Sequence, residues 1–150
     1  MKIVRKAVAV VLRPRDQATE VLVFRHPLAG VQIPKGTVEE DETIEAATLR
    51  ELKEESGLVL DGEPQFIGTW KRVVGGGPNE DGPLEINEWH IGILKPDVQL
   101  PDQWAHDATG SPAEEGLKFE FYWLSVDENL AENLHPLFTE TAKMIRAYED

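Results

Sequence analysis

Hydrophobic positions near the start of the chain form a nearly continuous run from Val4 to Leu12, rich in β-branched residues, that stops at Arg13. Such a run is typical of a central strand that is buried on both faces. After a polar turn, the segment from Glu20 to Arg25 predicts the hairpin partner of that strand. A short extended segment, Val31 to Gly36, follows and runs into a loop.

Two helices are predicted. The segment from Thr43 to Ser56 contains no Gly or Pro and consists mainly of good helix formers. We expect Asp41 to be its N-cap and Gly57 to end it in the left-handed conformation. A last helix is predicted from about Pro136, because apolar residues recur at helical spacing at Leu137, Phe138, Thr141, Ile145 and Tyr148.

Alternating apolar residues predict three further strands, over Gln65–Lys71, Glu85–Leu94 and Lys118–Leu124. Two long polar connections separate them. Val74 to Pro83 is rich in Gly and Pro and should be mobile, and Pro96 to Gly116 is of a length more often functional or disordered than idle. Strands interleaved with two helices predict an α+β fold whose sheet is covered on both sides.

Length and composition limit the classes of function. The chain has 150 residues with 41% hydrophobic content, which suits one domain over residues 1–150. A formal charge of −13 argues against a nucleic-acid partner. The absence of cysteine excludes disulfides, thiolate metal sites and a cysteine nucleophile. No segment is long enough to span a membrane, so we expect a cytoplasmic monomer or homodimer.

Three carboxylates should share one face of the first helix. Glu54 and Glu55 follow Glu51 by three and four residues, so each lies about one helical turn from Glu51. We expect the face that they share to be exposed. Their repulsion is unfavourable without a counter-charge, which a divalent cation such as Mg²⁺ supplies. Arg50 precedes Glu54 by four residues and can pair with it. The alternative interpretation is a simple solvated face of the helix.

The wider sequence favours the metal site. Gly36, five residues, Glu42, seven residues and then Arg50-Glu51-Leu52-Lys53-Glu54-Glu55-Ser56-Gly57-Leu58 match every specified position of the Nudix box. The chain therefore resembles the Nudix hydrolase family closely over residues 36–58, and in the order of its elements elsewhere. Asp41 differs from many members of this family, which have Gly there. That difference affects the start of the helix and not the metal face.

The resemblance implies an α/β/α sandwich with a mixed β-sheet, in which the box binds Mg²⁺ or Mn²⁺ and the enzyme cuts a phosphoanhydride bond. Glu42 and Arg50 would be supports, and Arg50 would order the catalytic carboxylates. Glu54 would bind the metal directly or through water. The implied metal ligands are the carbonyl of Gly36 and the side chains of Glu51, Glu54 and Glu55.

A general base is also needed to activate water. On the helix, Glu51 and Glu54 are the candidates. In the second long connection, Glu114 and Glu115 precede a strand and are the loop candidates, with Glu80 and Asp81 of the first connection behind them. Each of these loop residues taken singly is better explained as a solvated charge.

Four basic residues are candidates for binding substrate phosphates. Lys35 stands directly before Gly36 and would place an ammonium group beside the metal. Arg25 ends the strand that leads into the same loop, and Lys71 and Arg72 end a later strand. Together they would form a basic rim in an otherwise acidic protein.

The box identifies the bond that is cut and not the group attached to it. The sequence Pro34-Lys35-Gly36 resembles the branch acting on diadenosine polyphosphates and inositol pyrophosphates. We therefore expect a small-molecule nucleotide substrate, a dinucleoside polyphosphate or a nucleoside triphosphate. ADP-ribose hydrolysis and a catalytically silent nucleotide-binding module are the alternatives. Trp104, in the second long connection, is the tryptophan considered for base stacking, and the other three are expected in the core.

Overall fold

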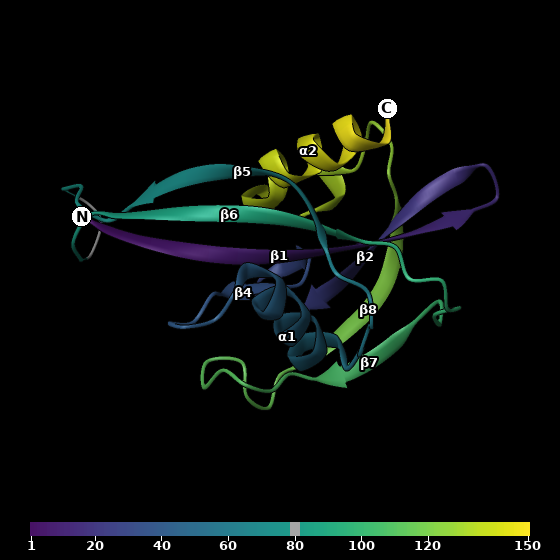
Figure 1. Ribbon diagram of the computed structural model, residues 1–150, viewed down its shortest axis with the longest axis horizontal. Coiled ribbons are helices and arrows are strands. Elements are labelled where there is room, and N and C mark those ends of the chain that lie inside the picture. Colours follow the sequence, from purple (N-terminus) through teal and green to yellow (C-terminus); the bar gives the residue numbers. More distant parts are fainter. Residues whose placement is uncertain (79–81) are drawn as a thin grey trace.

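Strand β1 (Lys2–Arg15) is the centre of the fold in the computed structural model, which describes residues 1–78 and 82–150 (Figure 1). It runs parallel to β6 (Glu85–Leu94) along most of its length. It also pairs antiparallel with β2 (Ala18–His26) through its last residues and with β4 (Lys35–Thr37) near its middle. β1 thus connects the two halves of a mixed sheet.

The strand order is β5-β6-β1-β2-β8-β7, with β3 beside β2 and β4 beside β1. Two strands differ from the sequence-based expectation. β5 continues to Val74, so Lys71 and Arg72 lie within it and do not end it. β7 lies inside the connection expected to be irregular, because four residues are too few to show a clear alternation. The remaining strands are β3 (Gly30–Gln32), β5 (Gln65–Val74), β7 (Trp104–Asp107) and β8 (Lys118–Ser125).

The helices α1 (Ile44–Ser56) and α2 (Thr139–Glu149) cover opposite faces of the sheet (Figure 1). Two short 3-10 helices, η1 (Ala131–Asn133) and η2 (Pro136–Phe138), precede α2. The expected α/β/α sandwich with a mixed sheet is confirmed. Among the described residues, no helix is long and apolar enough to cross a membrane.

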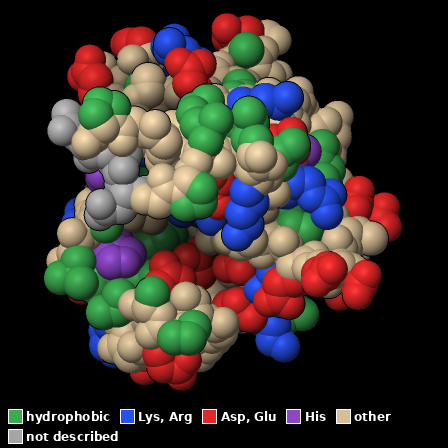
Figure 2. Space-filling view, turned by 90° about the vertical axis from the view of Figure 1, so that its left-hand side faces the viewer, with side chains coloured by type: hydrophobic (Ala, Val, Ile, Leu, Met, Phe, Trp, Pro, Cys, Tyr) green, Lys and Arg blue, Asp and Glu red, His purple; other side chains and the backbone are tan. Residues whose placement is uncertain are grey.

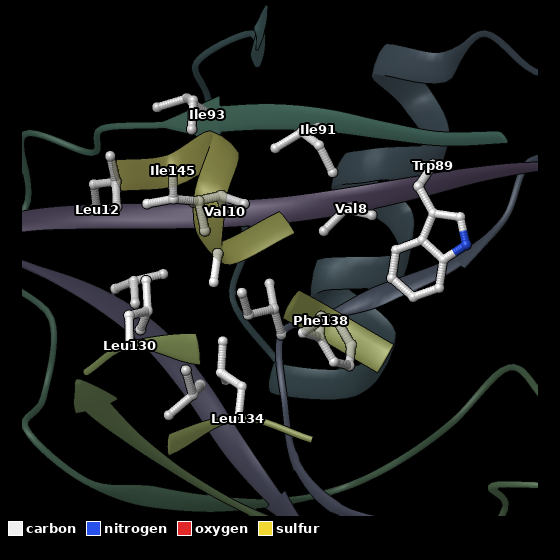
Figure 3. Close-up of a cluster of buried hydrophobic side chains, with 14 residues drawn as sticks. Val8, Val10, Leu12, Trp89, Ile91, Ile93, Leu130, Leu134, Phe138 and Ile145 are labelled. Atoms are coloured by element: carbon white, nitrogen blue, oxygen red, sulfur yellow. The ribbon is translucent and has the colours of Figure 1, made fainter. Parts of the chain in front are cut away.

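β1 contributes side chains to a hydrophobic core on each face. Val8, Val10 and Leu12 pack with Phe138 and Ile145 on the α2 face (Figure 3). The intervening residues Ala9 and Val11 pack with Leu52 of α1 and with aromatic residues of β2 and β8 on the other face. Burial on both faces explains why the sequence shows a continuous apolar run rather than an alternation.

The N-cap of α1 is Thr43 and not Asp41. The Thr43 hydroxyl accepts a hydrogen bond from the backbone N–H of Ala46 at 3.1 Å. Asp41 lies two residues earlier in the chain with φ of 66°, in the left-handed region. Both residue types cap helices, so their order alone cannot choose between them. Gly57 ends the helix as expected, with φ of 82° and its N–H donating to Lys53 O at 2.8 Å.

Replacing the cap should destabilise the protein measurably. We expect Thr43→Ala to lower the free energy of unfolding by about 1 kcal/mol, because an N–H of the first turn loses its acceptor. Asp41→Gly is the matched control and should be neutral or stabilising, since glycine adopts a positive φ without strain. Urea unfolding of both variants checks this. If Asp41→Gly lowered the free energy of unfolding more than Thr43→Ala, Asp41 and not Thr43 would be the N-cap.

Candidate functional site

The box carboxylates do not lie on an exposed face, because Glu51 and Glu55 pack against β4 and Glu54 packs against the loop between β7 and β8. Glu55 is only 2% exposed, and the side chain of Glu51 is 12% exposed. One oxygen of Glu55 accepts a hydrogen bond from the backbone N–H of Lys35 in β4 at 2.9 Å. The expectation of an exposed face was wrong, because β4 and the loop between β7 and β8 cover this part of the helix. Helical spacing predicts which residues share one face of a helix, but it does not predict which other segments pack against that face.

Gly36 fits directly against the Glu51 carboxyl group. A methyl group on Gly36 would overlap the carboxyl atoms of Glu51, so a side chain at this position would displace one of the two elements. Glycine is therefore required here by close approach. The structure brings the Gly36 peptide and Glu51 together, as the metal-ligand hypothesis requires.

Arg50 holds the acidic residues in place. Its guanidinium makes a two-pronged ion pair with Glu42, at 2.7 and 2.9 Å. It also donates to Glu51 at 2.7 Å and to Glu54 at 3.3 Å, and to the carbonyl of Thr37 at 3.0 Å. The hydrogen bond from Arg50 lowers the pKa of Glu42 below its ordinary value. The expected roles of Glu42 and Arg50 as supports agree with this geometry.

Burial makes the carboxyl groups of Glu51 and Glu55 resist ionisation. Burial raises the pKa of Glu51 to about 7, even though Arg50 acts in the opposite direction. The pKa of Glu55 is raised well above its ordinary value, first by burial and then by the charges of Glu114 and Glu51. A group of acids that repel one another in a poorly hydrated place is stabilised by a cation.

A loop from β7 to β8 closes over the end of α1. The backbone N–H of Thr109 donates to the carbonyl of Glu54 at 3.1 Å. Gly110 has φ of 86°, and a methyl group there would overlap the Glu54 carboxyl. Sequence analysis missed both residues, although a glycine within a polar loop is the one signal that could have pointed to them.

The loop between β7 and β8 places the adjacent residues Glu114 and Glu115, the two candidate bases, in different environments. Glu114 is half-buried, and its charge acts on both Glu51 and Glu55. Glu115 is exposed. The charge of Glu114 thus acts on the box carboxylates, whereas Glu115 faces solvent. The other two loop candidates, Glu80 and Asp81, lie outside the described residues.

A second lysine joins Lys35 near the site. Lys6 of β1 donates to the Thr37 hydroxyl at 2.7 Å. Burial and the charge of Lys35 lower the pKa of Lys6, whereas Glu85 and Glu51 act in the opposite direction. Sequence analysis did not select Lys6, because a lysine before a buried strand carries no motif. Its position beside β4 makes it a phosphate-binding candidate with Lys35.

Two of the other basic candidates, Arg25 and Lys71, have partners elsewhere. Arg25 pairs with Glu120 at 3.7 Å and lies over the ring of Tyr122. Lys71 pairs with Glu88 at 3.8 Å. Within residues 1–78 and 82–150, no ion pair or hydrogen bond joins Arg25, Lys71 or Arg72 to the α1 carboxylates. A basic rim formed by all four candidates therefore gains no support.

Trp104 has a structural role in β7. Its indole N–H donates to the carbonyl of Ser56 at 2.9 Å, and its ring stacks on Phe121 at 5.2 Å between centroids. These contacts attach β7 to the end of α1 and to β8. The hypothesis that Trp104 stacks on a substrate base rested on its being in an irregular loop, and that part was wrong.

The donor set suits a hard cation. Figure 2 shows a hollow at the end of the molecule where the N-terminus lies, lined with Asp and Glu side chains and with Lys and Arg beside it. Within the described part of the chain, no three acidic or histidine side chains already surround one point. Arg50 holds oxygens of Glu51 and Glu54 instead. The oxygen ligands and the mutual repulsion fit Mg²⁺ or Mn²⁺.

Comparison with known proteins identifies the family. The family model for the NUDIX domain matches residues 4–148. A search of curated proteins finds no match.

Several solved structures share the fold at low sequence identity. An Ap4A hydrolase of C. elegans is 17% identical with a TM-score of 0.58, and the match covers 98% of this chain and 96% of that one. The NUDIX domain of Shewanella oneidensis NrtR, solved with ADP ribose, is 17% identical with a TM-score of 0.59, covering 100% and 90%. A MutT protein from Methanosarcina mazei Go1 is 21% identical with a TM-score of 0.57, covering 99% and 97%.

These similarities show the fold. The family model extends over nearly the whole chain and includes the complete box at residues 36–58. The chain therefore belongs to the NUDIX family and is a Nudix hydrolase.

Proposed function

We propose that this protein hydrolyses a phosphoanhydride bond in a nucleoside diphosphate-linked substrate, using Mg²⁺ or Mn²⁺. The observation that carries the proposal is the packing of the Glu51 carboxyl against Gly36 and the hydrogen bond from the Lys35 N–H to the buried Glu55, with the charge of Glu114 acting on both carboxyls. Such a cluster is unfavourable unless a cation neutralises it. Phosphoanhydrides resist hydrolysis because their charge repels nucleophiles, so neutralising charge is what the reaction requires.

Glu51, Glu54 and Glu55, with the carbonyl of Gly36, are the residues that would hold the metal. When bound, the metal supplies charge neutralisation and lowers the pKa of a water molecule. Arg50 orients Glu51 and Glu54 through its hydrogen bonds.

Positive charge for the substrate comes from two lysines. Lys35 and Lys6 lie at β4, next to the acidic cluster, where ammonium groups can bind phosphate oxygens. Glu114 is the loop residue placed to accept a proton from the attacking water, because its charge already acts on Glu51 and Glu55.

A dinucleoside polyphosphate or a nucleoside triphosphate is the proposed substrate. The Pro34-Lys35-Gly36 sequence and the similar fold of an Ap4A hydrolase support the first of these. ADP-ribose hydrolysis is the alternative, and it is supported by the fold shared with an ADP-ribose-bound domain. A silent nucleotide-binding module is less well supported, because the complete charged set of the box is present and assembled.

Hydrolysis should depend on the metal. We expect release of phosphate or of a nucleoside monophosphate from a panel of dinucleoside polyphosphates, nucleoside triphosphates and ADP-ribose to stop in EDTA and to return with excess Mg²⁺. Glu51→Gln should lower kcat by about 100-fold, or about 2.7 kcal/mol of barrier. Full activity in EDTA, or a folded Glu51→Gln with wild-type kcat at saturating Mg²⁺, would contradict the proposal. Tight binding without turnover would favour the silent module.

The two adjacent loop glutamates give a matched pair. Glu114→Gln should lower kcat by about 10- to 1,000-fold, because it removes a candidate base near the cluster. Glu115→Gln should leave kcat within about twofold of wild type, because its side chain is exposed. Steady-state kinetics at saturating Mg²⁺ would measure both. Equal effects of the two substitutions on kcat would contradict the assignment of Glu114, rather than Glu115, as the general base.

The ion pair of Glu42 and Arg50 should give a pH-dependent contribution to stability. A carboxyl whose pKa is depressed on folding stabilises the protein above its ordinary pKa, and this contribution is lost as the pH falls through the folded-state pKa. Glu42→Gln should therefore cost up to about 1 kcal/mol at neutral pH and progressively less below about pH 4.5. Urea unfolding of both proteins in EDTA across this range is the measurement. A difference that stays constant with pH would contradict the assigned role.

A further inference from the structure

The last turn of α1 has carbonyl groups that the helix itself cannot satisfy. Two of them accept hydrogen bonds from the segment that contains β7 and the loop after it. The indole N–H of Trp104 donates to the carbonyl of Ser56 at 2.9 Å, and the backbone N–H of Thr109 donates to the carbonyl of Glu54 at 3.1 Å. Figure 1 shows β7 and this loop along one side of α1. The end of α1 is therefore attached to the β7–β8 connection at two points.

These hydrogen bonds set the path of the loop next to Glu54. Thr109 also donates its hydroxyl to the carbonyl of Glu54 at 3.4 Å, and the preceding residue, Ala108, is buried. Gly110 comes next and has φ of 86°, in the left-handed region. Its α-carbon lies against the Glu54 side chain, where an added methyl group would overlap the carboxyl carbon and both carboxyl oxygens.

The Glu54 carboxyl group is held less closely by hydrogen bonds than its neighbours on α1. The Arg50 guanidinium lies 2.7 Å from Glu51 but 3.3 Å from Glu54. Glu55 accepts a hydrogen bond from the backbone N–H of Lys35, and within residues 1–78 and 82–150 no backbone N–H donates to the Glu54 carboxyl group. The close approach of Gly110 is therefore a second restraint on this side chain, and it acts by steric contact.

We propose that Gly110 is a positioning residue, which confines the Glu54 carboxyl group beside Arg50 and so keeps it available to the metal. A glutamate side chain has several rotatable bonds, and a ligand that must be ordered on binding holds a metal less tightly than one already in place. This inference rests on the proposed metal-dependent function. It extends the metal site to a loop outside the box, the same loop that carries Glu114.

Gly116 provides a matched control in the same loop. Both glycines are exposed and lie in the left-handed region, with φ of 86° at Gly110 and 84° at Gly116. Alanine at either position should be strained, so both substitutions should lower Tm by a similar amount. A methyl group on Gly116 would meet no atom within 4 Å, whereas one on Gly110 would overlap Glu54. The pair therefore separates backbone strain from displacement of Glu54.

Titration of the protein with Mn²⁺, followed by the electron paramagnetic resonance signal of the unbound ion, measures the metal site without substrate or turnover. Gly110→Ala should weaken Mn²⁺ binding by about tenfold, and Gly116→Ala should leave it within about twofold of wild type. The Mg²⁺ concentration that gives half-maximal hydrolysis should rise in Gly110→Ala by the same factor as the Mn²⁺ dissociation constant.

Shortening Glu54 tests whether the loss of affinity passes through this side chain. Glu54→Asp withdraws the carboxyl group from Gly110, so it should weaken Mn²⁺ binding by itself but remove the overlap. In the Glu54→Asp background, Gly110→Ala should then reduce affinity by no more than about twofold. Gly110→Asn, with Gly116→Asn as its control, is the second pair if Gly110→Ala does not fold, because Asn tolerates the left-handed region better than Ala.

Equal Mn²⁺ affinities of Gly110→Ala and Gly116→Ala would overturn the positioning role, and so would a loss of affinity that persists undiminished in the Glu54→Asp background. Either result would leave the proposed hydrolysis intact, because the wild-type protein would still bind Mn²⁺. A wild-type protein that binds no Mn²⁺ would instead contradict the proposed function, and this inference with it.

Discussion

The burial of mutually repelling carboxylates beside one arginine is the constraint on which the rest of this site depends. Arg50 neutralises only part of the acidic charge around it, and the remainder is left in a place where water is scarce. The fold accepts this cost because α1 is held firmly by other contacts, including the packing of Leu52 and the caps at both ends. A small hard cation bound to these oxygens would offset this cost, which supports the proposed use of Mg²⁺ or Mn²⁺.

Much of this arrangement could be predicted from the sequence, because it depends on local spacing. The run from Val4 to Leu12 gave the central strand, and the separation of Glu51 from Glu55 gave one shared helix face. The remainder depends on contacts between distant segments. Thr43 and Asp41 are chemically interchangeable as caps until the backbone conformation is known. Glu114 and Glu115 are likewise equivalent in sequence, and the loop decides which one turns inward.

The roles of charged residues were harder to predict from the sequence than those of hydrophobic residues, because they too depend on contacts between distant segments. Basic residues were selected by their position near the box, yet Arg25 and Lys71 have acidic partners on neighbouring strands. Lys6 was overlooked because its relation to Lys35 comes from the pairing of β1 with β4. Hydrophobic periodicity reports which face of an element is buried, whereas the partner of a charged side chain is fixed by strand order and register.

The pairing of β1 with β4 has a consequence for how the protein comes to function. Ala7 lies opposite Gly36, and that register alone places the residue without a side chain against Glu51. A slip of one position would bring Lys35 or Thr37 to that point, where the side chain would collide with α1. Misregistered molecules could therefore not assemble the carboxylate cluster. Assembly of the site therefore depends on the correct register between β1 and β4. A molecule that is catalytically active would have these two strands correctly aligned.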